Sequence, residues 1–182
     1  MNRLLPGDFS GERYGLTFRF VDEGDAEFIV SLRTDSKLGR FINKTENSIE
    51  KQKEWTREYK KREEEGQDFY FIFSGLDGTK YGVCRIYNIV EGYHSTGSWL
   101  FSSQAPFGAA FLGDIITHEI AFELFPNSKY RFDIDKENVN VARFALSFHP
   151  SVIGETDNSI SYENTKENFD KYKKLYTRFC IK

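Results

Sequence analysis

The chain has 182 residues, of which 39% are hydrophobic and 16% aromatic, including 18 Phe and 10 Tyr. This composition excludes a disordered chain and suits one packed domain with an aromatic-rich core. The 25 Lys and Arg residues nearly balance 28 Asp and Glu residues, and the net charge of −3 provides no broad positive field, so neither nucleic acid nor an anionic membrane is an expected partner.

Targeting and metal-binding segments are not expected. Residues 1–15 contain only a short apolar pair, too short for the core of a signal peptide, and no later run approaches a membrane-spanning length. Cys84 and Cys180 belong to no CxxC motif or Cys/His cluster, so neither a disulfide framework nor a metal site is predicted. We therefore expect a cytoplasmic protein with a flexible N-terminal lead over residues 1–15 and a single domain over residues 16–182.

The first predicted elements are a strand and two helices. The run LTFRFV, residues 16–21, alternates like a strand, and Asp22 is placed to cap a helix, with Asp25 three residues on. A second helix is predicted after Ser48 and ends at Gly66. Its many charged residues are typical of a solvated face rather than of a binding tail.

The middle of the chain predicts strands over residues 68–74, 80–90 and 97–101. A turn at Asp77 and Gly78 joins the first two into a hairpin, and a loop over residues 91–96 leads to the third.

The C-terminal half alternates helices and strands. It predicts a long apolar helix over residues 109–125, a strand over 130–135, a helix capped by Asn138, a strand pair over 152–156 and 159–163, and a charged helix from about Thr165. Helices that cross between neighbouring strands imply some parallel pairing. The predicted fold class is therefore α+β, with a mixed, mostly antiparallel sheet covered on both faces.

The stretch SWLFSSQAPFGAAFLG, residues 98–113, leads from a strand through a loop of small residues into the long helix. Such a loop directs unpaired N–H groups and the positive end of the helix dipole at one point, which is typical of a phosphate site. The same pattern also describes an ordinary strand-to-helix turn, and the loop alone leaves both interpretations open.

The order of elements, with this loop before the longest buried helix, resembles the Gcn5-related N-acetyltransferase (GNAT) superfamily. The family's acyl-CoA loop reads Gln/Arg-x-x-Gly-x-Gly/Ala; here Gly108 and Ala110 match, and Ala105 stands where Gln or Arg is usual. The resemblance extends over nearly the whole chain, through LTFRFVDEGDAEFIVSLRTD, FYFIF, YGVCRIYNI and RFDIDKENVNVARF. The stretch SLRTDSKLGRFINKTENSIEKQKEW is similar to the substrate-side helices of enzymes that acetylate nucleotide-linked amino sugars, in the branch that also contains ribosomal-protein acetyltransferases.

The resemblance implies acetyl-CoA as the acyl donor, bound where two parallel strands of the GNAT fold splay apart. The cofactor contacts that it implies are Leu100, Phe101, Gln104, Ala105, Phe107, Gly108, Ala109, Ala110 and Asn138. The N–H groups of residues 105–110 would receive the pyrophosphate, and small residues would allow its close approach. Those small residues could also serve only to pack the helix on the strand, and Asn138 is equally well explained as a helix cap.

Direct attack of an amine on the thioester needs a base for the amine and an acid for the departing thiolate. The candidate bases are Asp133 in the strand 130–135, and Glu91 and His94 in the loop before residue 97. Asp133 could equally lie on a solvated strand face, and a histidine in the position of His94 is more commonly a surface loop residue.

The acid is not assigned by the resemblance. Ala145 stands where the family usually has Tyr or His, and His149 and Pro150 replace the customary Gly-Phe. Asp114 and His118 lie four residues apart on the long helix and could form a pair, although a solvated or satisfied pair is the commoner case.

The predicted function is transfer of acetyl from acetyl-CoA to a primary amine of a small polar acceptor, such as a nucleotide-linked amino sugar, by a monomer or homodimer. Arg33, Arg40 and Trp55 are candidate acceptor contacts, because Arg suits phosphate and an aromatic ring suits a base or sugar face. Each could equally serve packing or solubility. Two alternatives remain: a protein N-terminal acetyltransferase, which would have an open, acid-lined groove, and a non-catalytic acyl-CoA binding module.

Overall fold

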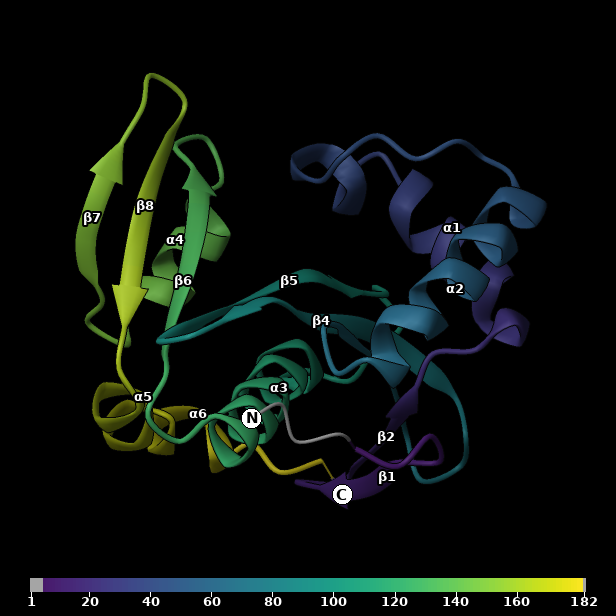
Figure 1. The fold of residues 1–182 in the computed structure, drawn as a ribbon, viewed down its shortest axis with the longest axis horizontal. Helices are drawn as coiled ribbons and strands as arrows, with labels where there is room; N and C mark the ends of the chain where they lie inside the picture. The colour runs from purple at the N-terminus through teal and green to yellow at the C-terminus, as the bar shows by residue number, and fades with distance from the viewer. Residues whose placement is uncertain (1–4, 182) are drawn as a thin grey trace.

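The computed structural model describes residues 5–181, and a mixed β-sheet organises them (Figure 1). Its strands are β1 (Ser10–Arg13), β2 (Leu16–Phe20), β3 (Phe69–Ser74), β4 (Lys80–Val90), β5 (Tyr93–Phe101), β6 (Lys129–Asp135), β7 (Ser151–Glu155) and β8 (Ser159–Asn164). They lie in the order β1-β2-β3-β4-β5-β6-β8-β7. Neighbours are antiparallel except β5 and β6, which are parallel. The predicted mixed, mostly antiparallel α+β sheet is confirmed.

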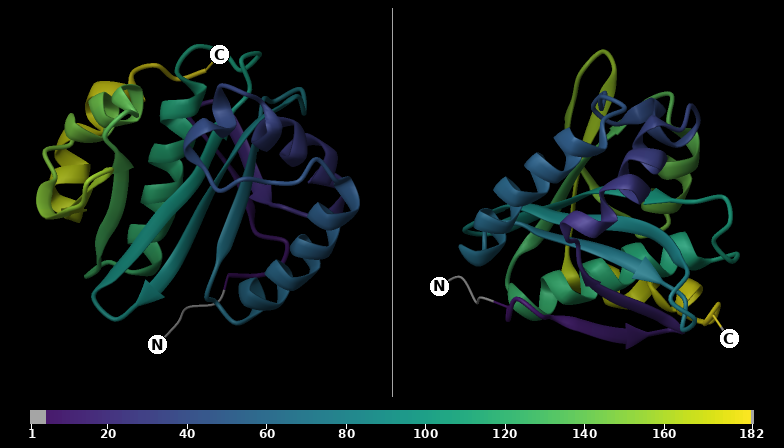
Figure 2. Two further views of the ribbon diagram at one scale, coloured as in Figure 1. Left: turned by 90° about the horizontal axis from the view of Figure 1, so that it is seen from above. Right: turned by 90° about the vertical axis from the view of Figure 1, so that its right-hand side faces the viewer.

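Helices cover both faces of the sheet (Figure 2). They are η1 (Glu23–Asp25), α1 (Ala26–Thr34), η2 (Leu38–Phe41), α2 (Ile49–Glu64), α3 (Ala109–Leu124), α4 (Val139–Leu146), α5 (Lys166–Tyr172) and α6 (Lys174–Thr177). Helices α1 and α2 pack with Tyr70 and Ile72 of β3, whereas α3 packs with Phe71 and Phe73 on the other face. Because both faces are covered, β3 is apolar along its whole length rather than alternating. None of the described helices has the length and apolarity needed to cross a membrane.

The helix caps follow the sequence. Asp22 accepts a hydrogen bond from the Gly24 N–H and forms a capping box with Asp25, although the capped turn is the short helix η1. Ser48 caps α2 through the Lys51 N–H. These side-chain oxygens satisfy N–H groups that have no partner within the helix.

The sheet begins earlier than the sequence predicts. Residues 1–4 of the expected flexible lead lie outside the described part of the chain, but Ser10–Arg13 form β1 and pair with β2. The run SGER carries no apolar alternation, because β1 is an edge strand whose side chains are exposed or half-buried. Phe9, just before it, anchors the strand by packing on Phe18 and Phe71.

Strands β4 and β5 form a long hairpin joined at Glu91 and Gly92, where Gly92 takes a φ of 88°. The predicted loop over residues 91–96 is therefore wrong from Tyr93 onward. The sequence did not indicate a strand here, because polar residues suggested an exposed loop. His94 and Ser95 are instead buried in β5, between neighbouring strands.

Strands β5 and β6 pair only at their first residues, Tyr93 with Lys129 and His94 with Tyr130, and then diverge. A bulge in β5 lies further along, where Ser98 takes a φ of 51°. The bulge places two residues of β5 opposite one of β4 and bends the strand. The splayed parallel pair implied by the resemblance is confirmed.

Candidate active site

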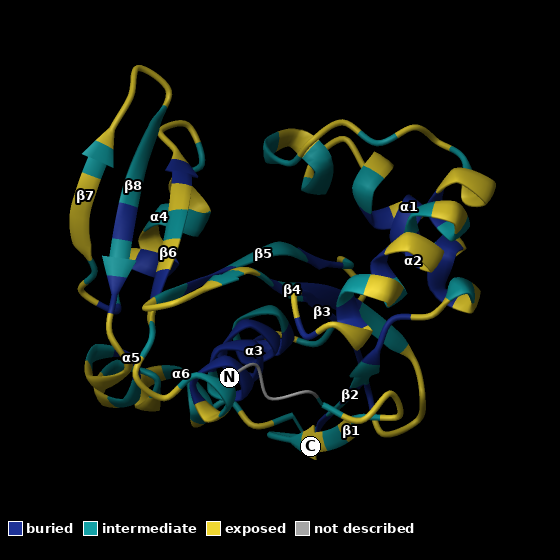
Figure 3. Ribbon diagram, viewed as in Figure 1, coloured by how far each residue is buried: buried dark blue, intermediate teal, exposed yellow. Residues whose placement is uncertain are grey.

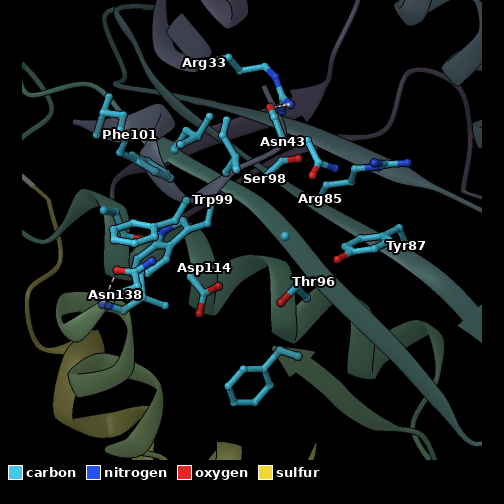
Figure 4. Close-up of a pocket in the computed structure, with 18 of the residues that line it drawn as sticks. Arg33, Asn43, Arg85, Tyr87, Thr96, Ser98, Trp99, Phe101, Asp114 and Asn138 are labelled. Carbon is cyan, nitrogen blue, oxygen red and sulfur yellow. Dashed lines mark hydrogen bonds between the residues drawn. The ribbon is translucent and has the colours of Figure 1, made fainter. Parts of the chain in front are cut away.

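A cleft of about 990 Å³ opens between the diverging parts of β5 and β6. One wall comes from α1, the segment between α1 and α2, and the outer face of β4; the other comes from α3, β6 and α4 (Figure 4). The cleft therefore lies where unpaired strand edges offer backbone groups to a ligand. Figure 3 shows that β3 and α3 are built largely of buried residues.

Two of the three predicted acceptor contacts line the cleft. The Arg33 guanidinium donates from Nε to Thr45 Oγ1 at 2.5 Å and from Nη2 to the Asn43 carbonyl at 3.2 Å. Trp55 is half-buried and stacks on Tyr59 with ring centroids 5.7 Å apart. These contacts hold both side chains in place at the cleft wall.

The third predicted acceptor contact, Arg40, is not among the lining residues of the cleft. It is exposed and donates to Glu137 Oε2 at 2.6 Å. This ion pair joins η2 to the turn between β6 and α4, which lie on the two sides of the cleft.

Arg85 is a lining residue that sequence reasoning missed. Its Nε donates to Asp68 Oδ1 at 2.6 Å, and its guanidinium lies 5.3 Å from the Trp55 ring and 5.1 Å from the Tyr87 ring. Burial raises the pKa of Tyr87, although Arg85 opposes the shift. The available signal was a basic residue in the middle of the strand-like run KYGVCRIYNIV, flanked by Cys84 and Ile86.

Basic residues outnumber acidic ones along the cleft. The acidic and basic side chains of the lining, apart from its histidine, are Arg33, Lys37, Lys44, Lys51 and Arg85 on the basic side and Glu46, Asp114 and Asp133 on the acidic side. All five basic residues come from the stretch between α1 and β4. This wall suits an anionic ligand, because guanidinium and ammonium groups bind phosphate and carboxylate oxygens.

The loop before α3 has free hydrogen-bond donors. Gly108 caps α3 with a φ of 90°, a conformation that favours glycine, and a Cβ there would lie 3.2 Å from Phe179. Within residues 5–181, the N–H groups of Phe107, Gly108 and Ala110 make no hydrogen bond, whereas the N–H of Ala109 donates to the Pro106 carbonyl at 3.0 Å. Some of the donors predicted for a phosphate are therefore available, at the positive end of a helix of 16 residues.

The other predicted cofactor contacts divide into two groups. Leu100, Phe101, Ala110 and Asn138 line the cleft, whereas Gln104, Ala105, Phe107, Gly108 and Ala109 lie in the adjoining loop and helix start. Asn138 also caps α4 by accepting from the Val141 N–H at 3.4 Å, so it serves as a cap and faces the cleft. The N–H of Ala105 donates to the Ser102 carbonyl at 3.0 Å, which leaves it engaged within the loop.

The three candidate bases occupy different surroundings. Asp133 lies exposed on β6, accepts a hydrogen bond from the Ser161 hydroxyl and lines the cleft. Glu91 lies at the tip of the β4–β5 hairpin, outside the cleft lining. Of the three, therefore, only Asp133 lines the cleft in which a ligand would bind.

His94 is not the surface loop residue that its sequence position suggested. It is fully buried in β5, with Nδ1 2.8 Å from Ser128 Oγ and its ring packed on Phe122 and Tyr130. Burial lowers its pKa to about 4. His94 is consequently neutral near pH 7 and serves packing.

Helix α3 contributes Ala110, Asp114 and His118 to the cleft lining, at intervals of four residues. Figure 4 shows Asp114 among the side chains of the lining. Asp114 is 9% exposed and makes no hydrogen bond with any described residue; His118 Nε2 lies 3.6 Å from its Oδ2. Burial raises the pKa of Asp114 to about 7. The two side chains lie close together without a hydrogen bond, and the carboxyl of Asp114 faces the cleft.

Ala145, at the position where the resemblance led us to expect Tyr or His, is buried and lines the cleft. Its methyl group has no proton to give, so α4 supplies no acid at this position.

Comparison with known proteins places this geometry in context. Residues 15–149 match the family model described as an acetyltransferase (GNAT) domain. No curated protein matches the sequence.

The chain also matches solved structures along most of its length. The structure of apo FdhC, described as a nucleotide-linked sugar GNAT, has a TM-score of 0.84 and 32% identity, covering 96% of this chain and 99% of its own. A ribosomal-protein-S5-alanine acetyltransferase from Vibrio fischeri has a TM-score of 0.74 and 16% identity, covering 89% and 99%. Mycobacterium smegmatis RimJ in complex with CoA-disulfide has a TM-score of 0.71 and 16% identity, covering 88% of each chain. The last two likenesses are of fold alone.

Proposed function

The chain belongs to the GNAT acetyltransferase family, and we propose that it transfers acetyl from acetyl-CoA to the primary amine of a nucleotide-linked amino sugar. The observation that carries the choice of acceptor is the basic, aromatic-bearing wall between α1 and β4. A nucleotide-linked sugar offers what this wall would bind: a diphosphate for the cations and a base for an aromatic ring. Likeness at 32% identity to a nucleotide-linked sugar GNAT supports the same choice.

The donor side of the cleft fits acetyl-CoA. Free N–H groups at Phe107, Gly108 and Ala110 suit a pyrophosphate at the start of α3. Beyond His94, the edge of β5 that faces β6 is unpaired, so its backbone groups can hydrogen-bond the amides of the pantetheine arm. No lysine is required for this cradle, and the substitution of Ala105 for the usual Gln or Arg leaves the backbone donors intact.

The acceptor side places cations and rings on one face of the sheet. Arg85 and Tyr87 alternate along β4 with Cys84 and Ile86, which pack in the core against α3. Arg85 and Tyr87 therefore face the side of α1 and α2, together with Trp55. An acceptor held there brings its amine to the splay from the face opposite α3.

In the proposed chemistry, Asp133 accepts the amine proton. Asp133 shares the acceptor face with Tyr87, whose pKa it helps to raise. The amine nitrogen attacks the thioester carbonyl carbon, the N–C bond forms and the C–S bond breaks. Holding both reactants in one cleft supplies much of the rate, because it removes the entropic penalty of bringing them together.

A thiol-release screen with acetyl-CoA tests the proposal. The acceptor panel contains a nucleotide-linked amino sugar, the same amino sugar without its nucleotide, spermidine and a peptide with a free N-terminus. We expect release of free CoA with the nucleotide-linked amino sugar above all others. Release only with the peptide would replace this acceptor by a protein N-terminus, and calorimetric binding of acetyl-CoA without release on any amine would indicate a binding module.

A further inference from the structure

The side chain of Asp114 is the least explained group in the cleft. It is the one acidic residue in the buried stretch AAFLGDIITH of α3, between Gly113 and Ile115. A buried carboxylate usually accepts several hydrogen bonds, because an unsatisfied buried charge is strongly unfavourable. Asp114 has no such donor among the described residues, since His118 Nε2, at 3.6 Å from its Oδ2, is beyond hydrogen-bond distance.

Every element packed against Asp114 contributes weak or neutral partners. His118 on α3 is neutral, because burial lowers its pKa well below the usual value. Cys84 on β4 and Tyr130 on β6 are also neutral, since burial raises the pKa of each and the charge of Asp114 adds to both shifts. His94 on β5, a second neutral imidazole, faces His118. Nothing here stabilises a carboxylate, so the surroundings favour the protonated acid.

Asp114 lies in the part of the cleft where the proposed reaction still needs an acid for the departing thiolate. Asp114 lies one helical turn after Ala110, where α3 meets the loop with free N–H groups. It reaches the cleft from the α3 face of the sheet, whereas Asp133, Arg85 and Tyr87 are on the opposite face. In the tetrahedral intermediate the amine nitrogen and the sulfur occupy different corners of the former carbonyl carbon, so a group on each face of the sheet can serve one of them.

We propose that Asp114 is the general acid that protonates the departing thiolate of coenzyme A. The inference rests on the proposed function. As the C–S bond breaks, its electron pair stays on sulfur, which takes the carboxyl proton of Asp114. The amine proton goes to Asp133, and exchange with solvent restores both carboxyl groups. This role requires Asp114 to be protonated near neutral pH, and its pKa of about 7 meets that requirement.

His118 lies beside Asp114 without donating to it. Its Nδ1 has no partner within residues 5–181, whereas Nε2 lies 3.6 Å from Asp114 Oδ2 and 3.4 Å from Thr96 Oγ1. A separation of 3.6 Å is longer than a hydrogen bond, so His118 leaves the Asp114 carboxyl without a donor.

Kinetics of Asp114→Asn test the assignment. General acid catalysis contributes roughly 10²–10⁴ in rate, so we expect kcat to fall at least about 100-fold with the Kd for acetyl-CoA within about threefold of wild type. Asp114→Glu should recover part of this loss. The decline of kcat at high pH, which reports ionisation of the acid, should vanish in Asp114→Asn. A kcat within about fivefold of wild type would overturn the proposal.

Glu119→Gln is the matched control on the same helix. It makes the same carboxylate-to-amide change outside the cleft, where Glu119 contacts Arg13, Tyr14 and Lys173. We expect a kcat within about twofold of wild type, even if the stability falls. An equal loss of kcat in Glu119→Gln and Asp114→Asn would show that the effect is structural, and would overturn the assignment.

A carboxyl NMR titration separates this inference from the proposed function. With carboxyl carbons labelled by ¹³C, we expect one aspartate signal to titrate near pH 7 and to be absent from Asp114→Asn, whatever the acceptor is. A protein that shows this signal but acetylates no amine in the panel would refute the proposed function and retain the unusual acid. An Asp114 signal that titrates below about pH 5, as an ordinary carboxyl does, would overturn the inference even in an active enzyme.

Discussion

The raised pKa that suits Asp114 to act as an acid should also lower the stability of the fold at neutral and alkaline pH. Its pKa is about 7 in the folded protein against an ordinary value of 3.8, so between these values the folded chain holds a proton that the unfolded chain has lost. A raised carboxyl pKa contributes stability below pH 3.8, and that contribution is lost as the pH rises toward 7. Above pH 7 the fold contains a buried, unpaired charge.

The first prediction is that Asp114→Asn is more stable than wild type at alkaline pH. We expect its advantage over wild type in the free energy of unfolding to be larger at pH 8.5 than at pH 5 by roughly 1–3 kcal/mol, because the amide cannot ionise. Urea unfolding of both proteins at the two pH values measures the difference. An advantage of equal size at both pH values would show that ionisation is not its cause.

The second prediction concerns His94, whose pKa is lowered to about 4 by burial. Below pH 6.5 the unfolded chain takes up a proton that the folded chain excludes, so stability falls as the pH drops from 6.5 toward 4. His94→Asn removes this group while keeping an N–H donor for Ser128 Oγ, whose own proton goes to the Phe125 carbonyl, and should reduce the loss of stability between pH 7 and pH 4 by roughly 2–3 kcal/mol. Thermal or urea unfolding at several pH values measures it; parallel curves for the two proteins would contradict it.

Residue types and spacing predict part of the site. Arg33, Trp55 and Asp133 were expected from side-chain chemistry and do line the cleft. Arg85 and Asp114 were not assigned, because each looks like an isolated polar residue in an apolar element. Their surroundings come from β4, α2, α3 and β6, which are distant in sequence, so the lack of a partner for Asp114 is visible only in three dimensions.

At the scale of elements, the junction of the loop and α3 forms the part of the cleft that we assign to acetyl-CoA. Ala110 is half-buried at the start of α3 and lines the cleft. An acidic residue in the first turn of a helix favours the helix itself, because it complements the dipole. The same charge would repel a pyrophosphate seated there.

The third prediction follows from these opposite effects of an acidic residue on the helix and on the pyrophosphate. Ala110→Asp should keep or gain stability but lose at least about tenfold in acetyl-CoA affinity, since it repels the pyrophosphate and occupies the donors. Ala110→Asn, of the same size and neutral, is the control and should lose less affinity. Isothermal calorimetry measures both. Equal affinities for Ala110→Asp and wild type would place the pyrophosphate elsewhere.

Most elements could be predicted because their signals are local. Caps at Asp22, Ser48 and Asn138 mark helix starts, and apolar periodicity marks the long helix and β3. Strand β1 and the start of β5 were not predicted, because they form strands by pairing with neighbouring strands and their own residues carry no strand-like pattern. A polar run such as YHST becomes a strand only when β4 and β6 satisfy its backbone on both sides.

At the scale of the whole molecule, the net charge of −3 conceals a local positive wall. Of the four basic lining residues in α1, α2 and the segment between them, the three lysines are exposed, so salt screens their attraction for an anion. The Debye length falls from about 10 Å at 0.1 M salt to about 3 Å at 1 M.

The fourth prediction is a selective effect of salt. Raising the ionic strength about tenfold should increase the KM for a nucleotide-linked amino sugar several-fold and leave the KM for the free amino sugar nearly unchanged. Steady-state kinetics at fixed, saturating acetyl-CoA measure both constants. Equal salt effects on the two acceptors would assign the dependence to the donor or to the protein as a whole.

The mass of the acceptor after reaction tests the central claim most directly. The protein is incubated with acetyl-CoA and an equimolar mixture of a nucleotide-linked amino sugar, the same sugar without its nucleotide, and an N-terminal peptide. Mass spectrometry should show one added acetyl group on the amine of the nucleotide-linked sugar, formed faster than any other product. Acetylation of the peptide first, or of no acceptor, would contradict the account.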